Sequence, residues 1–213
     1  MATVLVNELA LFVNPALVML GADTLIALSV SASETIQNLA SITFLGLVEE
    51  VLMEANWVDV QKRDSSLTAD SNHVADEFPY GYALPSDFVH LVGEPRYIGA
   101  GVVPKGQKHW RVNGTKLETS CLGPDILYVY KTSDAVDAGT DDAYYTLMKA
   151  PLRAAIIAKL MAAWAAPVAG HDPIKYEQLY RLKLNSMRTL NAKQSPPAQM
   201  SPNTLMNMRQ FHA

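Results

Sequence analysis

The sequence predicts an α+β fold: a helical bundle of about four helices with a central antiparallel β insertion and an extended C-terminal tail. Three observations lead to this prediction. Apolar residues recur at three- and four-residue steps near both ends of the 213-residue chain. Short β-rich runs separated by turn residues fill the middle. The last twenty residues hold three prolines and little periodicity. We assign residues 1–193 to one domain and residues 194–213 to the tail.

The first two helices are expected over residues 3–20 and 31–57. Pro15 should kink or split the first helix, because proline removes a hydrogen-bond donor and clashes with the preceding turn. Ser31 and Glu34 have the spacing of a capping box at the start of the second helix. One apolar face of the second helix is formed by Ile36, Leu39, Ala40, Phe44, Leu47, Val51, Leu52 and Ala55.

The β insertion is expected over residues 78–132, after a polar surface loop at residues 61–77. Asn113-Gly114 is the residue pair preferred by a type I′ hairpin turn. The segment 126–130 is apolar on both faces, which is typical of a central strand. The candidate strands are Phe88–Val92, Tyr97–Ala100, Trp110–Val112, Lys116–Thr119 and Ile126–Tyr130.

Two more helices are expected over residues 142–166 and 173–192. Pro151 predicts a kink in the third helix. Asp172 suits the N-cap of the fourth helix and Pro173 suits its first position. The apolar face of the third helix comprises Tyr144, Leu147, Met148, Leu152, Ala155, Ile156, Lys159, Leu160 and Ala163. The expected core anchors of the fourth are Ile174, Leu179, Leu182, Met187 and Leu190.

The chain has a single cysteine, Cys121, so no internal disulfide can form, which fits a reducing compartment. We expect Cys121 to be a small buried apolar residue. We expect no export signal or membrane span. The apolar segment 1–20 lacks Lys and Arg, and a span over 150–170 would have to bury Arg153 and Lys159.

No motif in the sequence indicates catalysis. None of the five histidines is paired at i, i+4, and one cysteine cannot build a cysteine-based zinc site. Glu49/Glu50 and Asp141/Asp142 are adjacent carboxylates, but neighbours on a helix point about 100° apart. We interpret the first pair as a solvated helix face and the second as favourable charge at a helix start. We therefore assign no catalytic, cofactor-binding or metal-binding residues and do not expect an enzyme.

The modest net charge of −4 hides a strong asymmetry. Residues 1–148 carry 19 acidic and 8 basic residues, whereas residues 149–213 carry 2 acidic and 9 basic residues. One interpretation is solvated faces with cations suited to helix C-termini. The other is that a basic helix steers assembly with an acidic partner or a neighbouring subunit. The partner-interface candidates on this helix are Lys175, Arg181, Lys183 and Arg188.

The order of several segments resembles one known family, although none of the short motifs is specific alone. These segments are Asn14-Pro15-Ala16-Leu17, Val51-Leu52 with Trp57, Phe78-Pro79-Tyr80, Leu84-Pro85-Ser86-Asp87-Phe88, Trp110-Arg111-Val112-Asn113-Gly114, Ile126-Leu127-Tyr128 with Tyr130-Lys131, and Lys175-Tyr176 to Leu184. In this ordered combination, over about residues 7–192, the chain resembles tail tubular protein A, the head-to-tail adaptor or connector of short-tailed bacteriophages.

The resemblance implies a structural virion protein with no catalysis and no cofactor. Twelve copies would form a dodecameric ring in the neck of the virion, between the portal protein and the tail nozzle protein. The ring would extend the DNA channel, make non-specific contact with DNA, help to retain the packaged genome until ejection, and have no membrane partner. Assembly would take place in the host cytoplasm. The alternatives are a head-completion adaptor of a long-tailed phage, a cell-wall hydrolase, or a DNA-binding factor that uses the basic fourth helix.

The tail at residues 194–213 has few helix or strand signals. It is either a disordered end or a segment that orders on the portal or on an adjacent copy through coupled folding. The second interpretation rests on its large apolar side chains, which are further interface candidates: Leu205, Met206, Met208 and Phe211.

Overall fold

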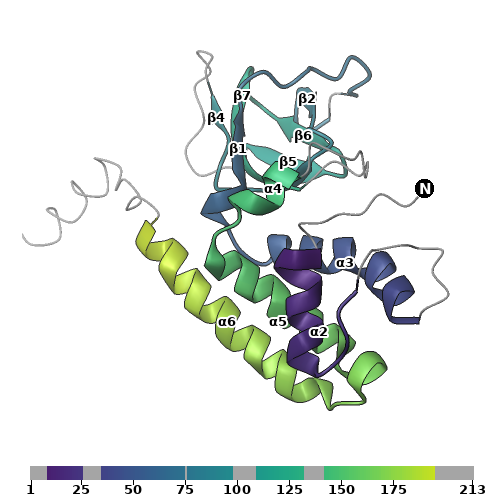
Figure 1. Ribbon diagram of the computed structural model, residues 1–213. Helices are drawn as coiled ribbons and strands as arrows, with labels where there is room; N and C mark the ends of the chain where they lie inside the picture. Colours follow the sequence, from purple (N-terminus) through teal and green to yellow (C-terminus); the bar gives the residue numbers. More distant parts are fainter. Residues whose placement is uncertain (1–8, 26–34, 75, 98–108, 132–141, 195–213) are drawn as a thin grey trace, which may run out of the picture.

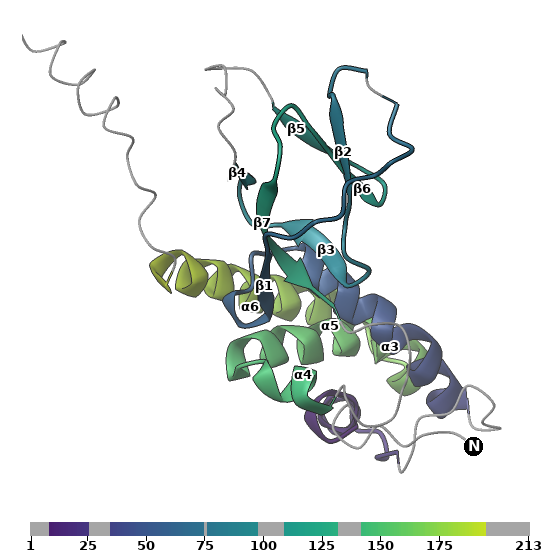
Figure 2. The same ribbon diagram turned by 90° about the horizontal axis from the view of Figure 1, so that it is seen from above.

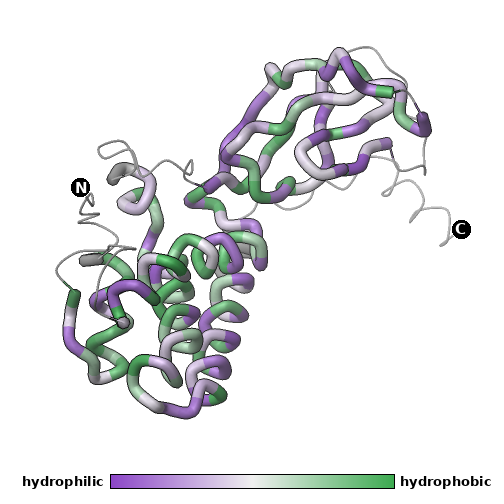
Figure 3. Tube along the Cα trace, turned by 90° about the vertical axis from the view of Figure 1, so that its right-hand side faces the viewer, coloured by the Kyte–Doolittle hydropathy of each residue, from purple (hydrophilic) through white to green (hydrophobic). Residues whose placement is uncertain are grey.

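A computed structural model describes residues 9–25, 35–74, 76–97, 109–131 and 142–194. The α+β prediction is confirmed: a body of helices carries a β lobe at one end (Figure 1). Figure 3 shows the two parts as separate lobes joined at a narrow junction. Several predicted features lie outside the described residues, namely 3–8 of the first helix, 31–34 with the capping box, and the tail over 195–213.

The predicted first helix is split next to Pro15. A π-helix over Leu9–Val13 is followed by α2, Asn14–Leu20. Pro15 lies in the first turn of α2, where the missing N–H leaves no helical hydrogen bond unmade. Gly21 ends α2 in a left-handed conformation with φ of +78°, which a residue with a side chain rarely adopts.

Helix α3 spans Thr35–Met53, so the predicted end at residue 57 is wrong. The chain leaves the helix early because Trp57 folds back, and its indole Nε1 donates to the Val51 carbonyl at 2.8 Å. The predicted apolar face is confirmed in its main part. Its fully buried members, joined by Val48, are Ala40, Phe44, Val51 and Leu52.

The predicted third helix is two helices, α4 at Asp142–Leu147 and α5 at Ala150–Ala169. A kink at Pro151 was expected, but Pro151 lies in the first turn of α5, where proline is tolerated, and the chain breaks before it. Two predicted core residues, Leu147 and Ala163, are exposed. The buried residues of α5 are Leu152, Ala155, Ile156, Ala158, Leu160, Met161, Trp164 and Ala165.

Helix α6 spans Pro173–Gln194 and packs along α5. Its predicted start is confirmed, since the Asp172 carboxylate accepts the Ile174 N–H at 2.9 Å. Two predicted core anchors are wrong: Ile174 is 62% exposed and Leu182 is 69% exposed. Helix α6 instead turns Tyr180 and Leu184 toward α5.

The β lobe consists of two antiparallel sheets. In the first, β7 pairs with β1, β3 and β4, and in the second β6 lies between β2 and β5. The sequence missed two of these strands, β1 and β2, and had placed β1 in a surface loop because its residues are polar. In chain order the strands are β1 Gln61–Asp64, β2 Tyr80–Ala83, β3 Phe88–Leu91, β4 Arg96–Tyr97, β5 Trp110–Asn113, β6 Lys116–Thr119 and β7 Pro124–Tyr130.

The predicted hairpin between β5 and β6 is confirmed, but its turn differs from the expectation. Asn113 pairs with Lys116, so the two loop residues are Gly114 and Thr115. Gly114 has φ of +59° and Thr115 does not have a positive φ. These signs fit a type II′ turn, which needs glycine only at its first central position, and not the type I′ turn.

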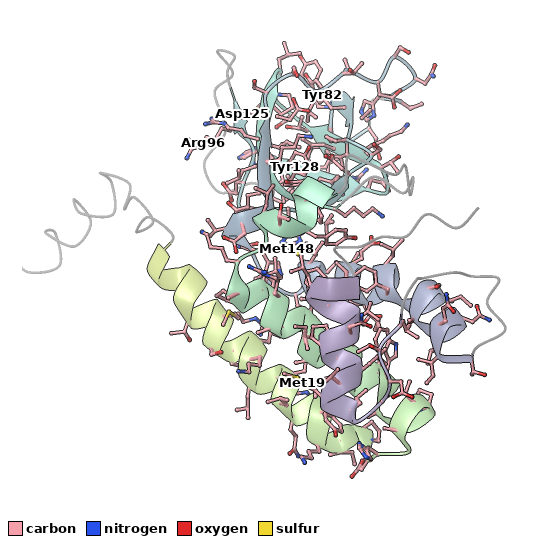
Figure 4. All side chains as sticks on the ribbon, viewed as in Figure 1. Met19, Tyr82, Arg96, Asp125, Tyr128 and Met148 are labelled. Atoms are coloured by element: carbon pink, nitrogen blue, oxygen red, sulfur yellow. The ribbon has the colours of Figure 1, made fainter. Side chains whose placement is uncertain are left out.

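Strand β7 is central, as predicted, and its two faces belong to different cores. Val129 is fully buried in the core that the helices form. Ile126 and Tyr128 point the other way and pack with Tyr82 and Leu117 between the two sheets. In Figure 4, Tyr82 and Tyr128 lie within the β lobe. Because successive side chains of a strand point to opposite faces, β7 contributes to the cores of both lobes and joins them.

Replacing Val129 with alanine should destabilise the protein by about 2 kcal/mol, because it removes two buried carbon atoms and leaves a cavity at the junction. Leu127→Ala is the matched control, since Leu127 lies on the same face of β7 but is exposed. Urea unfolding followed by circular dichroism measures both variants. Equal losses would contradict the assigned role of Val129.

Candidate interaction surfaces

The basic residues predicted on the fourth helix all lie on α6, with Lys175 and Lys183 on one side of the helix and Arg181 and Arg188 on the other. All four are exposed: Lys175, Arg181, Lys183 and Arg188. Arg181 pairs with Glu177 one turn earlier at 3.2 Å, and Arg188 donates to the Glu54 carbonyl at 2.8 Å. Lys175 and Lys183 have no acidic partner within 4.0 Å among the described residues. Their charge is therefore available to an external partner.

The row of α6 side chains on the side opposite α5 carries no charge. At 100° per residue, the side chains that point farthest from α5 form a stripe, with basic side chains on both sides of it. Its members, all exposed, are Ile174, Gln178, Leu182, Asn185 and Thr189. Two members of this stripe, Ile174 and Leu182, are apolar and the other three are polar, so another helix could approach it without meeting a charge.

A second exposed surface lies on α3 and was missed by the sequence analysis. Ile42, Leu45 and Met53 are 63%, 43% and 56% exposed. Gly46 lies between them, and a Cβ added there would meet no heavy atom within 4 Å. Glycine inside a helix costs about 1 kcal/mol relative to alanine, so an unexplained Gly46 was the signal available in the sequence.

Helix α3 also differs from α6 in charge. It contains Glu49 and Glu50 and no basic residue, and the Glu50 side chain is 58% exposed. The predicted solvated face is confirmed for Glu50, which is exposed, whereas Glu49 is half-buried, and both residues make ion pairs. Glu49 binds Lys131 at 3.2 Å and Glu50 binds Lys159 at 2.8 Å.

The polar contacts that join the helices to the β lobe include three side-chain pairs. One is the Glu49–Lys131 pair, and another links Lys149 to Asp59 at 2.9 Å. In the third, His90 Nε2 lies 3.0 Å from the Asn56 side-chain oxygen. Burial lowers the pKa of His90, so the neutral imidazole is favoured at this junction.

Two carboxylates of the β lobe are stabilised in their charged form by hydrogen bonds from arginine and asparagine side chains. Asp125 on β7 accepts from Arg63 Nε at 2.8 Å, and this bond lowers the pKa of Asp125. Asn113 and Arg111 likewise lower the pKa of Glu118. Each of these acids bonds to a side chain of a neighbouring strand. The bonds therefore stabilise the pairing of the strands.

Asp87 has two partners of its own. It accepts from Lys62 Nζ at 2.9 Å and from the Tyr128 hydroxyl at 3.0 Å. Burial and this hydrogen bond raise the pKa of Tyr128.

The remaining candidates are Cys121, possible metal ligands, and residues outside the described ranges. Cys121 is buried and free, as expected. No group of three His, Cys, Asp or Glu that could hold a metal lies within the described ranges. Asp141 of the acidic pair lies outside those ranges, and so do the four interface candidates of the tail, Leu205, Met206, Met208 and Phe211.

No known family model matches the chain, and no curated protein is significantly similar to it. Helices α3 and α5 are both long and apolar enough to cross a membrane by length and composition, a property that core helices of soluble proteins share.

The Arg63–Asp125 pair should make stability depend on pH. The folded-state pKa of Asp125 lies below its usual value of 3.8, so the stabilisation is complete above that pH and is lost as pH falls through the folded-state pKa. We expect Asp125→Asn to be less stable than the wild type at pH 7, with a difference that shrinks toward pH 2–3. Thermal unfolding over this range measures the difference. A difference independent of pH would contradict the ion-pair assignment.

Proposed function

We propose that the protein is the head-to-tail adaptor of a short-tailed bacteriophage, a structural ring protein between the portal and the tail nozzle. It acts by binding, and it takes part in virion assembly and DNA ejection without catalysis. The resemblance of its ordered segments to tail tubular protein A suggests this function. The observation that carries the proposal further is the division of the protomer into a helical body and a β lobe with different surfaces (Figure 3).

An adaptor must bind different proteins at its two ends, and the fold supplies two ends. The β insertion leaves the helical body after α3 and returns before α4, so both of its connections lie at the junction. Buried Val129 and the Glu49–Lys131 and Lys149–Asp59 pairs hold the lobes together there. Because the helical body and the β lobe are held together, they would keep a partner bound to one in a fixed position relative to a partner bound to the other.

The charges of α6 support a role in assembly. Lys175 and Lys183 are exposed and lack acidic partners in the described ranges, so they are free to meet an acidic portal surface, a neighbouring copy or DNA phosphates in the channel. The association of such surfaces is fast at low salt and weakens as salt rises.

The ring proposal is tested by mass. The full chain is purified alone and after co-expression with the portal protein of the same virus, and the mass of each assembly is measured. A closed ring attached to the portal, of about twelve copies, supports the adaptor. A monomer that does not bind the portal contradicts it.

The double charge reversal Lys175→Glu with Lys183→Glu should weaken assembly with the portal at moderate salt, because it replaces with anions two exposed cations that have no acidic partner among the described residues. We expect at least a tenfold loss of association, about 1.4 kcal/mol. The control is Arg96→Glu, which reverses an exposed charge on β4 in the other lobe. Size-exclusion chromatography with light scattering measures complex formation. Unchanged assembly would show that the charges of α6 do not contribute to portal binding.

The tail is proposed to order on the portal or on an adjacent copy, through Leu205, Met206, Met208 and Phe211. Deleting residues 195–213 should leave a protein that unfolds as cooperatively as the full chain, because the described buried core is built from residues between Phe12 and Leu184. The deleted protein should fail to attach to the portal. Normal attachment would make the tail dispensable.

A further inference from the structure

One face of α3 carries exposed apolar residues, as parts of α2 and α6 also do. Ile42, Leu45 and Met53 lie along it, and Gly46 stands open between them. Contacts within the chain do not explain a glycine at this position, since its Cβ site is empty. Without a side chain at Gly46, another helix could approach the α3 backbone closely. Another helix could therefore pack closely against this face of α3.

The chain itself provides a helix that matches this face in shape and length. The stripe on α6 is uncharged, with exposed Ile174 and Leu182 among its members. Helix α3 has 19 residues and α6 has 22, so they are about 28 and 33 Å long. Two such helices can remain in contact over most of their length.

The two helices also match in charge. Glu49 and Glu50 are the charged residues of α3, and Glu50 keeps an exposed carboxylate although it pairs with Lys159. Helix α6 presents Lys175 and Lys183 without acidic partners among the described residues. Glu49 lies on the α3 face itself, between Gly46 and Met53, whereas Lys175 and Lys183 lie beside the α6 stripe. These opposite charges favour contact of α3 with α6 over contact of either helix with its own copy.

Within one protomer these faces cannot meet, because α5 lies between α3 and α6 (Figures 1 and 2). We propose that the α3 face of one copy binds the α6 face of the next copy. This contact joins two different surfaces, so repetition produces a closed ring or a filament and not an isolated dimer. The inference rests on the proposed ring function and assigns the surfaces that build it.

Two variants, each with one face blocked, test the inference in the full chain. Ile42→Glu with Leu45→Glu blocks the α3 face, and Leu182→Glu blocks the α6 face. All three positions are exposed, so folding should be retained, which circular dichroism checks. Each variant alone should lose self-association by about 100-fold, because assembly would bury the introduced carboxylates against the uncharged side chains of the partner face.

An equimolar mixture of the two variants gives the decisive result. Each variant keeps one intact face, so the mixture should form a heterodimer and grow no further. Sedimentation velocity distinguishes this dimer from monomer and ring. Leu122→Glu is the matched control, because it replaces an exposed apolar residue of the β lobe and should assemble like the wild type.

Several outcomes would overturn the inference. These are normal assembly of either blocked variant, a mixture that stays monomeric, and a wild type that is monomeric both alone and with the portal. If Leu182→Glu assembles but the α3 variant does not, the α3 face binds another occupant, such as its own copy or another segment of the chain. Failure of the proposed function has a different signature: a wild type that self-associates through both faces but does not bind the portal.

Discussion

The structure depends on the two-sided burial of β7. Alternate residues of this strand face different cores, with Val129 among the helices and Ile126 and Tyr128 between the sheets. Because the side-chain period of a strand is two, a shift of one residue would exchange the faces and expose both cores. The register of β7 therefore determines the pairing of β1, β3 and β4 and the place where the helical body meets the β lobe.

Polar contacts reinforce this junction where apolar burial ends. Glu49–Lys131 and Lys149–Asp59 join residues far apart in the sequence, and His90 meets Asn56 beside them. Single exposed pairs contribute little to stability, but several at one junction, next to a buried strand, restrict how the lobes can move. In the proposed adaptor role this restriction would matter more than high stability, because partners at the two ends would have to be held in register.

The sequence predicted best the features that depend on nearby residues. Pro15 indicated a break in the first helix, Asp172 a helix start and Asn113-Gly114 a hairpin, because each acts on the backbone within a few residues. It failed where a distant residue decides. β1 is polar and becomes a strand through β7 and the Arg63–Asp125 pair. Likewise, the spacing of Leu182 fits a core position, but the way α6 lies on α5 exposes it.

The wrong prediction for Leu182 follows from the same physics as the proposed interface. Periodicity reports that a residue belongs to an apolar stripe, but it does not report whether the stripe is covered by the same chain or by another copy. Ile42 and Leu182 remain exposed in the isolated protomer although both lie on long helices. A contact between copies would bury both and would bring the acidic and basic parts of the chain together. The net charge of −4 thus conceals an acidic and a basic part of the chain, which the proposed interface would bring together.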